Sequence, residues 1–256
     1  MVSSTEAEIR LIGLQGIPEV KPGDHLAPLI AAAAEHCGLA LADGDILVVT
    51  QKIVSKSEGR LVCLRDVEPS GFARRLAAQR RADARFIEVV LRESHRIVRM
   101  DERVIITETP HGLICANAGV DRSNIADDDC VSLLPENPDA SARRLRDDLR
   151  QHSGVEVGLI IADTFGRPWR EGLTNVAIGL AGLAPLTDFR HRRDDHDRPL
   201  MTTVLATADE LAGAAGLIMR KTMRIPAVIV RGFPFDAGEC GMRELLRARE
   251  RDLFHY

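Results

Sequence analysis

The sequence lacks the features that nucleic-acid-binding proteins usually show. Aromatic residues make up 4% of the 256 residues, with one tryptophan (Trp169) and one tyrosine (Tyr256), so side chains on which unpaired bases stack are scarce. The formal net charge is −4, whereas affinity for a phosphate backbone comes mainly from clustered lysine and arginine. We therefore expect no nucleic-acid partner, and instead a soluble protein with small-molecule partners.

Long apolar runs and paired cysteines are also missing. No stretch of about 18 apolar residues occurs, and the N-terminus lacks the basic and apolar regions of an export signal. The five cysteines are scattered, odd in number and without a CxxC pair, which argues against a disulfide framework and against a zinc site. We expect a protein of the reducing cytoplasm without a membrane partner.

Several common site motifs are absent. The sequence contains no GxxxxGKS or GxxxxGKT phosphate-binding loop and no GxGxxG after an expected strand, and HExxH, GxSxG and EF-hand patterns do not occur. Any nucleotide site must therefore be built on a different fold.

Strand-like and helix-like segments alternate along the chain, which predicts a mixed α/β (α+β) fold. Helices are expected at 26–37, 141–152 and 208–220, and strands at 9–14, 45–50, 86–91, 103–107, 113–116, 157–162 and 226–232. Asp24 is the expected N-cap of the first helix, and Gly38 its C-terminal stop. Two prolines within 134–139 suggest a boundary between two lobes of a single unit that spans residues 1–256.

Three segments carry side chains suited to ligand chemistry. The first, residues 50–60, directly follows an expected buried strand and contains Lys52, Lys56 and Arg60. A loop at the rim of a sheet is a common place for a ligand, and these cations suit phosphate groups. The alternative is a solvated surface loop with charges of both signs, and the segment alone does not exclude it.

The second segment is Ala118-Gly119-Val120-Asp121-Arg122-Ser123-Asn124. A carboxylate after a small turn, followed by an amide three residues later, suits a hard cation and a hydrogen bond to a ligand. The alternative is an Asx turn, in which Asp121 accepts a hydrogen bond from its own backbone. Asp127, Asp128 and Asp129 could likewise be metal ligands, but a run of three consecutive acids is more typical of an exposed face or a helix start.

The third segment, residues 160–172, begins as an apolar strand that reaches Asp163 and Thr164. A carboxylate beside a hydroxyl at a sheet edge can hold a divalent ion that bridges nucleotide phosphates. Arg167 and Arg170 are candidates for binding anionic groups. The alternative is a β-turn with Trp169 packed on the core.

In their order these segments resemble the coenzyme F420-0:L-glutamate ligases, also called coenzyme F420 gamma-glutamyl ligases. The matching pieces are GIPEVKPGD at 16–24, QKIVSKSEGR at 51–60, AGVDRSN at 118–124 and ADTFGRPWR at 162–170. Each piece alone is a weak signal, but four in one order are specific, and the resemblance runs from about Ile12 to Phe254.

The resemblance implies an activity. In that family GTP phosphorylates the terminal carboxylate of the deazaflavin precursor F420-0, and the amine of L-glutamate attacks the acyl phosphate; further γ-linked glutamates follow. The family uses two divalent cations per site, Mg²⁺ or Mn²⁺, and K⁺ in some cases, and its members form intertwined homodimers of two interlocked lobes. Because every reactant is an anion, metals and fixed cations must offset the repulsion.

The resemblance also assigns residues to roles. Asp121 and Asp163 are the expected ligands of the first metal and Thr164 of the second. The expected GTP contacts are Ile17, Pro18, Glu19, Val20, Gln51, Lys56 and Asn124.

Two positions depart from the family pattern. Some members have a Gly-Gln pair, with the glutamine on metal, where this chain has Arg220 and Lys221. A protonated lysine cannot ligate a metal, so either a ligand is missing or Lys221 contacts the nucleotide phosphates. Gln51 replaces a small hydroxyl residue of some members.

Two other functions remain open. A metal-dependent phosphohydrolase would use the same Asp121, Asp163 and Thr164 to activate water, and a non-catalytic nucleotide-binding module would bind GTP without turnover.

Overall fold

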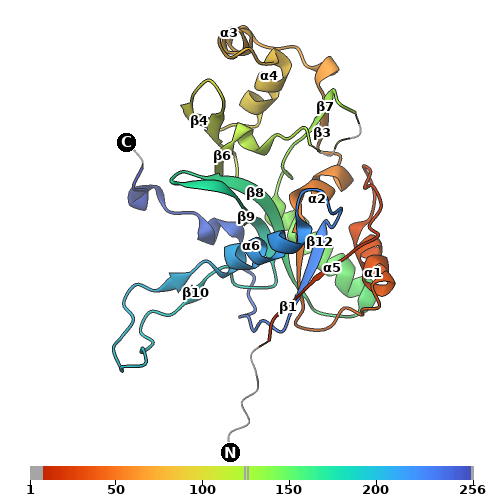
Figure 1. Cartoon of the computed structure of the whole chain (residues 1–256), viewed down its shortest axis with the longest axis vertical. Helices are drawn as coiled ribbons and strands as arrows, with labels where there is room; N and C mark the ends of the chain where they lie inside the picture. The colour runs from red at the N-terminus through yellow and green to blue at the C-terminus, as the bar shows by residue number, and fades with distance from the viewer. Residues whose placement is uncertain (1–7, 124, 126, 255–256) are drawn as a thin grey trace, which may run out of the picture.

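The computed structural model describes residues 8–123, 125 and 127–254, so the expected GTP contact Asn124 lies outside the described residues. A five-stranded sheet in the order β1-β12-β2-β8-β9 forms the centre of the molecule (Figure 1). Within it β2 and β8 are parallel, and the other neighbouring pairs are antiparallel. Its strands are β1 (Arg10–Gly13), β12 (Ala227–Arg231), β2 (Ile46–Thr50), β8 (Gly158–Arg167) and β9 (Arg170–Ala181).

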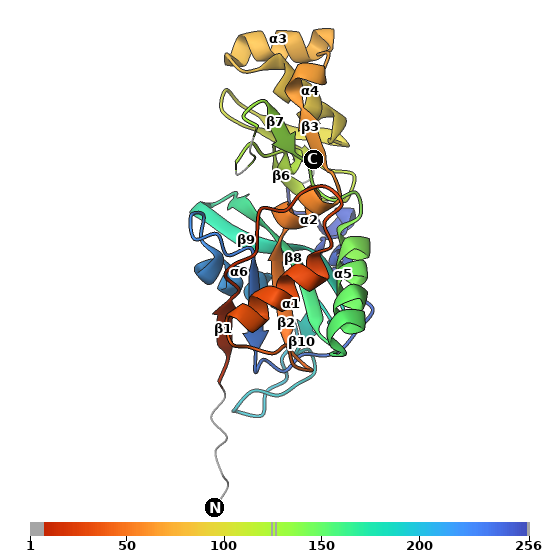
Figure 2. The same cartoon turned by 90° about the vertical axis from the view of Figure 1, so that its right-hand side faces the viewer.

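Helices cover both faces of this sheet. Helix α6 (Thr207–Met219) packs on one face, and α1 (Leu26–His36) and α5 (Pro138–Ser153) lie on the other (Figures 1 and 2). The first four residues of β2 and of β12 are all buried. A strand that is covered on both faces needs an unbroken run of apolar residues, and β-branched residues are common in such runs. The predicted mixed α/β class is therefore confirmed, as are these strands and helices.

A second region, residues 61–132, extends from one end of the sheet (Figure 2) and has its own apolar core. Leu133 packs in this second core, whereas its neighbour Leu134 packs in the core around the five-stranded sheet. The division of the chain into lobes stays a prediction. The elements of the region are β3 (Leu61–Cys63), η1 (Leu64–Asp66), α3 (Gly71–Arg80), α4 (Ala84–Arg92), β4 (Arg96–Met100), β5 (Ile105–Glu108), β6 (Ile114–Ala116), η2 (Asn117–Gly119) and β7 (Cys130–Ser132).

Short elements complete the chain. Helix α2 follows β2 directly, a two-stranded ribbon branches off after β9, and two 3-10 helices lie near the C-terminus. They are α2 (Gln51–Ser57), β10 (Thr187–Asp188), β11 (Val204–Leu205), η3 (Met242–Leu245) and η4 (Arg249–Arg251). Among the described residues, no helix is long and apolar enough to cross a membrane.

Two local predictions are wrong. The expected strand at 86–91 lies in α4, where Ile87 and Val90 are buried and Leu91 packs against the same core, the spacing of one helical face. A short apolar run does not distinguish a strand from a helix. Asp24 is not the N-cap of α1, because the cap residue is His25 and makes no side-chain bond. The Asp24 carboxylate instead accepts the Lys21 N–H at 2.7 Å.

Two expected breaks in regular structure are helical instead. The segment after β2 forms α2, with Gln51, Ser55 and Lys56 buried, so the interpretation as a solvated surface loop is wrong. Pro138 begins α5 rather than interrupting structure, because proline lacks only an N–H that a first helical turn leaves unbonded. The Asn137 side chain caps this helix by accepting the Ala140 N–H at 3.0 Å.

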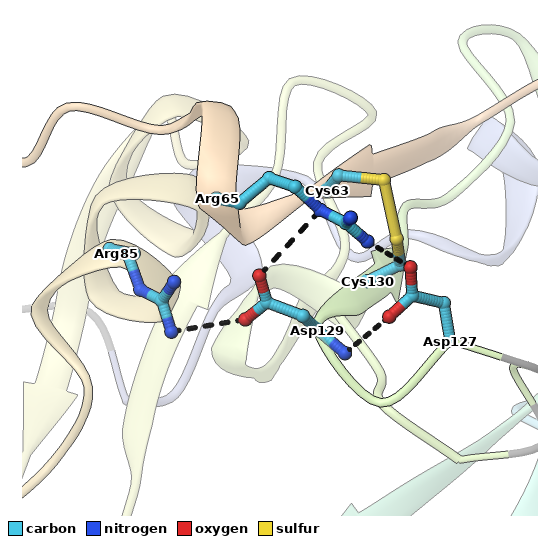
Figure 3. The surroundings of a disulfide bond; sticks show 6 residues. All are labelled: Cys63, Arg65, Arg85, Asp127, Asp129 and Cys130. Carbon is cyan, nitrogen blue, oxygen red and sulfur yellow. Dashed lines mark hydrogen bonds and ion pairs between the residues drawn. A yellow bond between two sulfur atoms is a disulfide. The ribbon is translucent and has the colours of Figure 1, made fainter.

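The argument against disulfides is wrong for one pair. Cys63 and Cys130 form a disulfide (Figure 3) and lie directly opposite each other in the antiparallel pair β3 and β7. Cys37, Cys115 and Cys240 are free. The pairing joins residues 67 positions apart, so no local spacing indicated it. The cysteine-based argument for a cytoplasmic location loses its basis, and that location stays a prediction.

Candidate active site

Strand β8 positions Asp163 and Thr164. Its buried first half lies parallel to β2, with Thr50 opposite Ala162, so the end of β2 lies one residue from Asp163 in register. Such an edge, where parallel strands end, is a common ligand position. The expected end of β8 is wrong, because the strand continues to Arg167 and forms a long hairpin with β9. Asp163 and Thr164 are half-buried at the point where β8 leaves the shelter of β2.

Asp121 reaches the site from the 61–132 region. Its backbone forms an isolated bridge with Ser132, with N–H to O distances of 3.0 and 2.8 Å. Its carboxylate accepts hydrogen bonds from Lys52 Nζ at 2.6 Å and from the Ser123 N–H at 2.8 Å and hydroxyl at 2.7 Å. The hydrogen bond from the Ser123 N–H forms the Asx turn that was the alternative interpretation. The bond from Lys52 shows that the Asp121 carboxylate in this turn also binds a cation.

The charge of Asp121 acts on Asp163. Burial and, to a smaller extent, the negative charge of Asp121 raise the pKa of Asp163 to about 6, against the opposite effects of the Thr164 N–H, Lys221 and Lys52. Burial alone raises the pKa of Asp121 as well, but its hydrogen bonds from Lys52 and Ser123 hold that pKa below the ordinary value. Two acids and two ammonium groups therefore share one electrostatic neighbourhood.

Thr164 lies between a cation and an amide. Lys221 Nζ donates to Thr164 Oγ1 at 2.8 Å, and that hydroxyl donates to Asn175 Oδ1 at 3.0 Å. Gly216 of α6 lies against Asn175, since a Cβ at this glycine would stand 2.9 Å from Asn175 Nδ2. This close contact fixes the amide. Sequence reasoning missed Asn175, because nothing in its neighbours marks it. It named Lys52 as a cation suited to phosphate groups, but it did not predict the contact of Lys52 with Asp121.

The donor set suits one divalent cation. Asp121 and Asp163 are the hard oxygen ligands that Mg²⁺ and Mn²⁺ prefer, and a cation between two mutually repelling carboxylates relieves their repulsion. The fit of a second ion at Thr164 is poorer, since its hydroxyl accepts from Lys221 and donates to Asn175, which leaves one lone pair for an ion. The residues that would hold a metal are therefore the two acids.

The expected GTP contacts gather around α2. Lys52 and Lys56 are four residues apart on this helix and so share one face. Lys56 is buried and forms an ion pair with the exposed Glu19, which links α2 to the turn 17–20. Within that turn Ile17 is half-buried, Pro18 is exposed and Val20 is buried. The helix thus connects this turn to the Asp121 loop.

Gln51 has a structural role. It is buried, and its Nε2 atom donates to the Leu133 carbonyl at 3.2 Å, which joins the start of α2 to the chain after β7. Its side-chain amide is therefore engaged by protein, and its contact with a nucleotide stays a prediction.

Arg167 and Arg170 face each other across the tip of the β8–β9 hairpin and are exposed. Arg167 donates to the carbonyls of Glu171 and Gly172, the latter at 3.4 Å. The expected turn is present, but Trp169 is 77% exposed, so the prediction that it packs on the core is wrong. Its ring contacts Phe254 with centroids 5.5 Å apart. Anion binding by the two arginines stays a prediction.

Comparison with known proteins gives consistent matches. The family model described as F420-0:Gamma-glutamyl ligase matches residues 15–232. The coenzyme F420:L-glutamate ligase of Methanothermobacter thermautotrophicus is 45% identical over 249 residues, covering 96% of this chain and 98% of that protein. The ligase of the same name from Methanopyrus kandleri is 47% identical over 241 residues, covering 92% and 93%. The chain therefore belongs to the F420-0:gamma-glutamyl ligase family.

Proposed function

We propose that this protein ligates L-glutamate to the terminal carboxylate of coenzyme F420-0 in coenzyme F420 biosynthesis, and then adds γ-linked glutamates. Family membership along most of the chain supports the proposal. The observation that carries it is the cluster in which the charge of Asp121 raises the pKa of Asp163, while Lys52 contacts Asp121 and Lys221 contacts Thr164. Such a cluster suits the transfer of a phosphoryl group between anions.

The proposed reaction has two steps. A carboxylate oxygen of F420-0 takes the γ-phosphoryl group of GTP and GDP leaves; the amine of L-glutamate then attacks the acyl carbon, loses a proton, and phosphate leaves. Asp121 and Asp163 would hold Mg²⁺ or Mn²⁺, which supplies charge neutralisation to the phosphoryl oxygens. Lys221 and Lys56 orient the nucleotide phosphates, the turn 17–20 contacts the nucleotide, and Arg167 and Arg170 bind anionic groups.

The proposal also covers additional metal ions, the role of Lys221 and two further GTP contacts. A second divalent ion at Thr164 and a K⁺ ion follow from the family resemblance alone. Because Lys221 already donates to Thr164, we assign it to the phosphates rather than to a missing ligand position. GTP contacts from Gln51 and Asn124 also follow from the family resemblance.

We also propose a homodimer located in the cytoplasm. Large apolar side chains that monomers usually bury are exposed on the β8–β9 hairpin, on α6 and in the C-terminal segment; among them are Trp169, Leu173, Leu217 and Phe254. A second copy of the chain is a suitable cover for them. Sedimentation velocity tests this part, and a monomer at micromolar concentration contradicts it.

The activity is tested by mass spectrometry. Purified protein is incubated with GTP, Mn²⁺, L-glutamate and F420-0, and the products are searched for F420-0 with one or more added glutamyl groups. We expect the adduct only when all four components are present, together with equal amounts of GDP and phosphate. Phosphate release without glutamate indicates the phosphohydrolase, and GTP binding without any product indicates the binding module; either outcome rejects the ligase.

A further inference from the structure

A cavity that neither Asp121 nor Asp163 lines lies beside the C-terminal segment. It has a volume of about 710 Å³ and is bounded by the β5–β6 turn of the 61–132 region and by the C-terminal segment around η3 and η4. Figure 1 shows that segment in dark blue on the same side of the molecule as the β8–β9 hairpin. Its polar lining includes His95, His111, Arg243, Arg247 and Arg251.

The cavity carries excess positive charge. Among the described residues, none of the guanidinium groups of Arg243, Arg247 and Arg251 forms a salt bridge with a carboxylate. The lining acid Glu108 is already paired with Arg96 at 2.6 Å, and the other lining acid, Glu244, accepts a hydrogen bond from the Cys240 thiol. Arg247 donates to the Arg251 carbonyl at 3.5 Å. Three guanidinium groups on the C-terminal wall, none of them paired with a carboxylate of the described residues, favour a ligand with several anionic oxygens, since a guanidinium binds carboxylate or phosphate by two parallel bonds.

The opposite wall is held rigidly. His111 lies within hydrogen-bond distance of the Pro135 and Glu136 carbonyls through Nε2, at 3.0 and 3.1 Å, and of the Thr109 hydroxyl through Nδ1 at 3.3 Å. Gly112 has φ of +88°, and a Cβ there would stand 2.9 Å from Leu246 Cδ1. This turn therefore packs tightly on the arginine-bearing segment, and the cavity has a preformed shape.

The cavity is connected to the acidic pair by a short piece of chain. Gly112 lines the cavity, and Cys115, three residues later on β6, is near enough to Asp163 for that carboxylate to raise the thiol's pKa, after burial as the main cause. Three residues of extended chain span at most roughly 10 Å. A ligand with one end at Asp163 has to cover this span and also the separation between Asp163 and Cys115 to reach the cavity.

We propose that this cavity binds the anionic part of the acceptor that is remote from its reacting carboxylate, with Arg243, Arg247 and Arg251 on its phosphodiester and carboxylate oxygens. The inference rests on the proposed function for the identity of the ligand. It explains how a chain of net charge −4 attracts an acceptor that gains a negative charge with each added glutamate: the basic residues are concentrated where the acceptor lies.

The test compares two variants that remove charge from the same segment. In the triple variant Arg243→Gln/Arg247→Gln/Arg251→Gln, we expect the KM for F420-0 to rise by roughly tenfold or more, the loss of about one charge-assisted bond. The KM for GTP and kcat at saturating F420-0 should stay within twofold of wild type. The matched control is Arg249→Gln, since Arg249 lies in η4 between two of these positions but does not line the cavity. All four arginines are exposed, so both variants should fold.

Direct binding separates this inference from the proposed function. F420-0, inorganic phosphate and L-glutamate are titrated separately by calorimetry without GTP. Tighter binding of F420-0 than of phosphate or glutamate, weakened in the triple variant, supports the subsite even if no ligase activity is found. An unchanged KM and affinity in the triple variant overturn the subsite while leaving an active ligase intact. If free phosphate binds as tightly as F420-0, and the triple variant loses this binding, the cavity is a phosphate site and the proposal of an acceptor subsite is rejected.

Discussion

Lys221 Nζ lies 2.8 Å from Thr164 Oγ1, so the turn after α6 reaches the strand that carries Asp163. The contact joins two segments that are 57 residues apart. It places an ammonium group near Asp163, at a position where some family members have a metal ligand. An ammonium group beside Thr164 can bind a phosphate group of the nucleotide without a metal ion on the Thr164 hydroxyl.

Replacement of Lys221 tests this assignment. In Lys221→Met the phosphates lose a charged donor, so we expect the KM for GTP to rise by roughly tenfold or more, with the KM for F420-0 nearly unchanged. Steady-state kinetics with each substrate varied in turn measures both values. Arg224→Gln, in the same turn, is the control and should behave like wild type. If Lys221→Gln is more active than wild type at high Mn²⁺, the position belongs to a metal ligand instead.

Asp163→Asn tests the acidic pair. The amide retains the size of the side chain but removes a negative charge beside Asp121, so we expect the fold to persist and turnover to fall by at least about a hundredfold. Circular dichroism checks the fold and the glutamyl-transfer assay checks the rate. The exposed Asp128 supplies the control, since Asp128→Asn should keep full activity. An active Asp163→Asn variant excludes Asp163 as a metal ligand.

The ion pair of Asp45 and Arg231 should stabilise the sheet strongly. Asp45 is 1% exposed, and Arg231 binds both its oxygens, at 2.7 and 2.6 Å, which ties the end of β12 to the start of β2. Arg231→Met leaves a buried carboxylate unpaired and should lower the free energy of unfolding by about 3–5 kcal/mol. Urea unfolding measures the loss. Arg193→Met breaks an exposed pair and should cost less than about 1 kcal/mol.

The Cys63–Cys130 disulfide should contribute to stability. It closes a loop of 67 residues, for which the chain-entropy model gives about 4 kcal/mol. We expect dithiothreitol to lower the urea midpoint of wild type and of a Cys240→Ser control, but not that of Cys63→Ser/Cys130→Ser. Because Cys115 is buried in the folded protein, the protein is unfolded in urea and alkylated without reductant, and mass spectrometry should then find three modified cysteines. Five modified cysteines mean that the bond is absent from the purified protein.

Asp83 should make stability fall in acid. Hydrogen bonds from the Arg85 side chain are the main cause that lowers its pKa to about 2. Because the folded pKa lies below the unfolded value, its stabilisation is complete above about pH 4 and is lost as the pH falls towards 2. Asp83→Asn should therefore cost about 1–2 kcal/mol at pH 7 and less than about 0.5 kcal/mol near pH 2. Asp195→Asn, an exposed control, should show no such difference.

Local sequence patterns predicted the central sheet well. Strands β2, β8 and β12 each begin with an unbroken run of buried apolar residues, because helices cover both faces and leave no place for polar side chains. The same logic failed at residues 86–91, because a short apolar run fits a strand or a helix equally well. There the packing of α4 against its neighbours selected the helix.

Four motifs in order were enough to identify the family, and the resemblance drew attention to the acids Asp121 and Asp163. Their surroundings became visible in the folded chain: Lys52 contacts Asp121, Lys221 contacts Thr164, and three arginines line a cavity. Covalent spacing sets which residues neighbour each other within an element. Contacts between elements depend on how helices and strands pack, and this information is spread over the whole core rather than held in any segment.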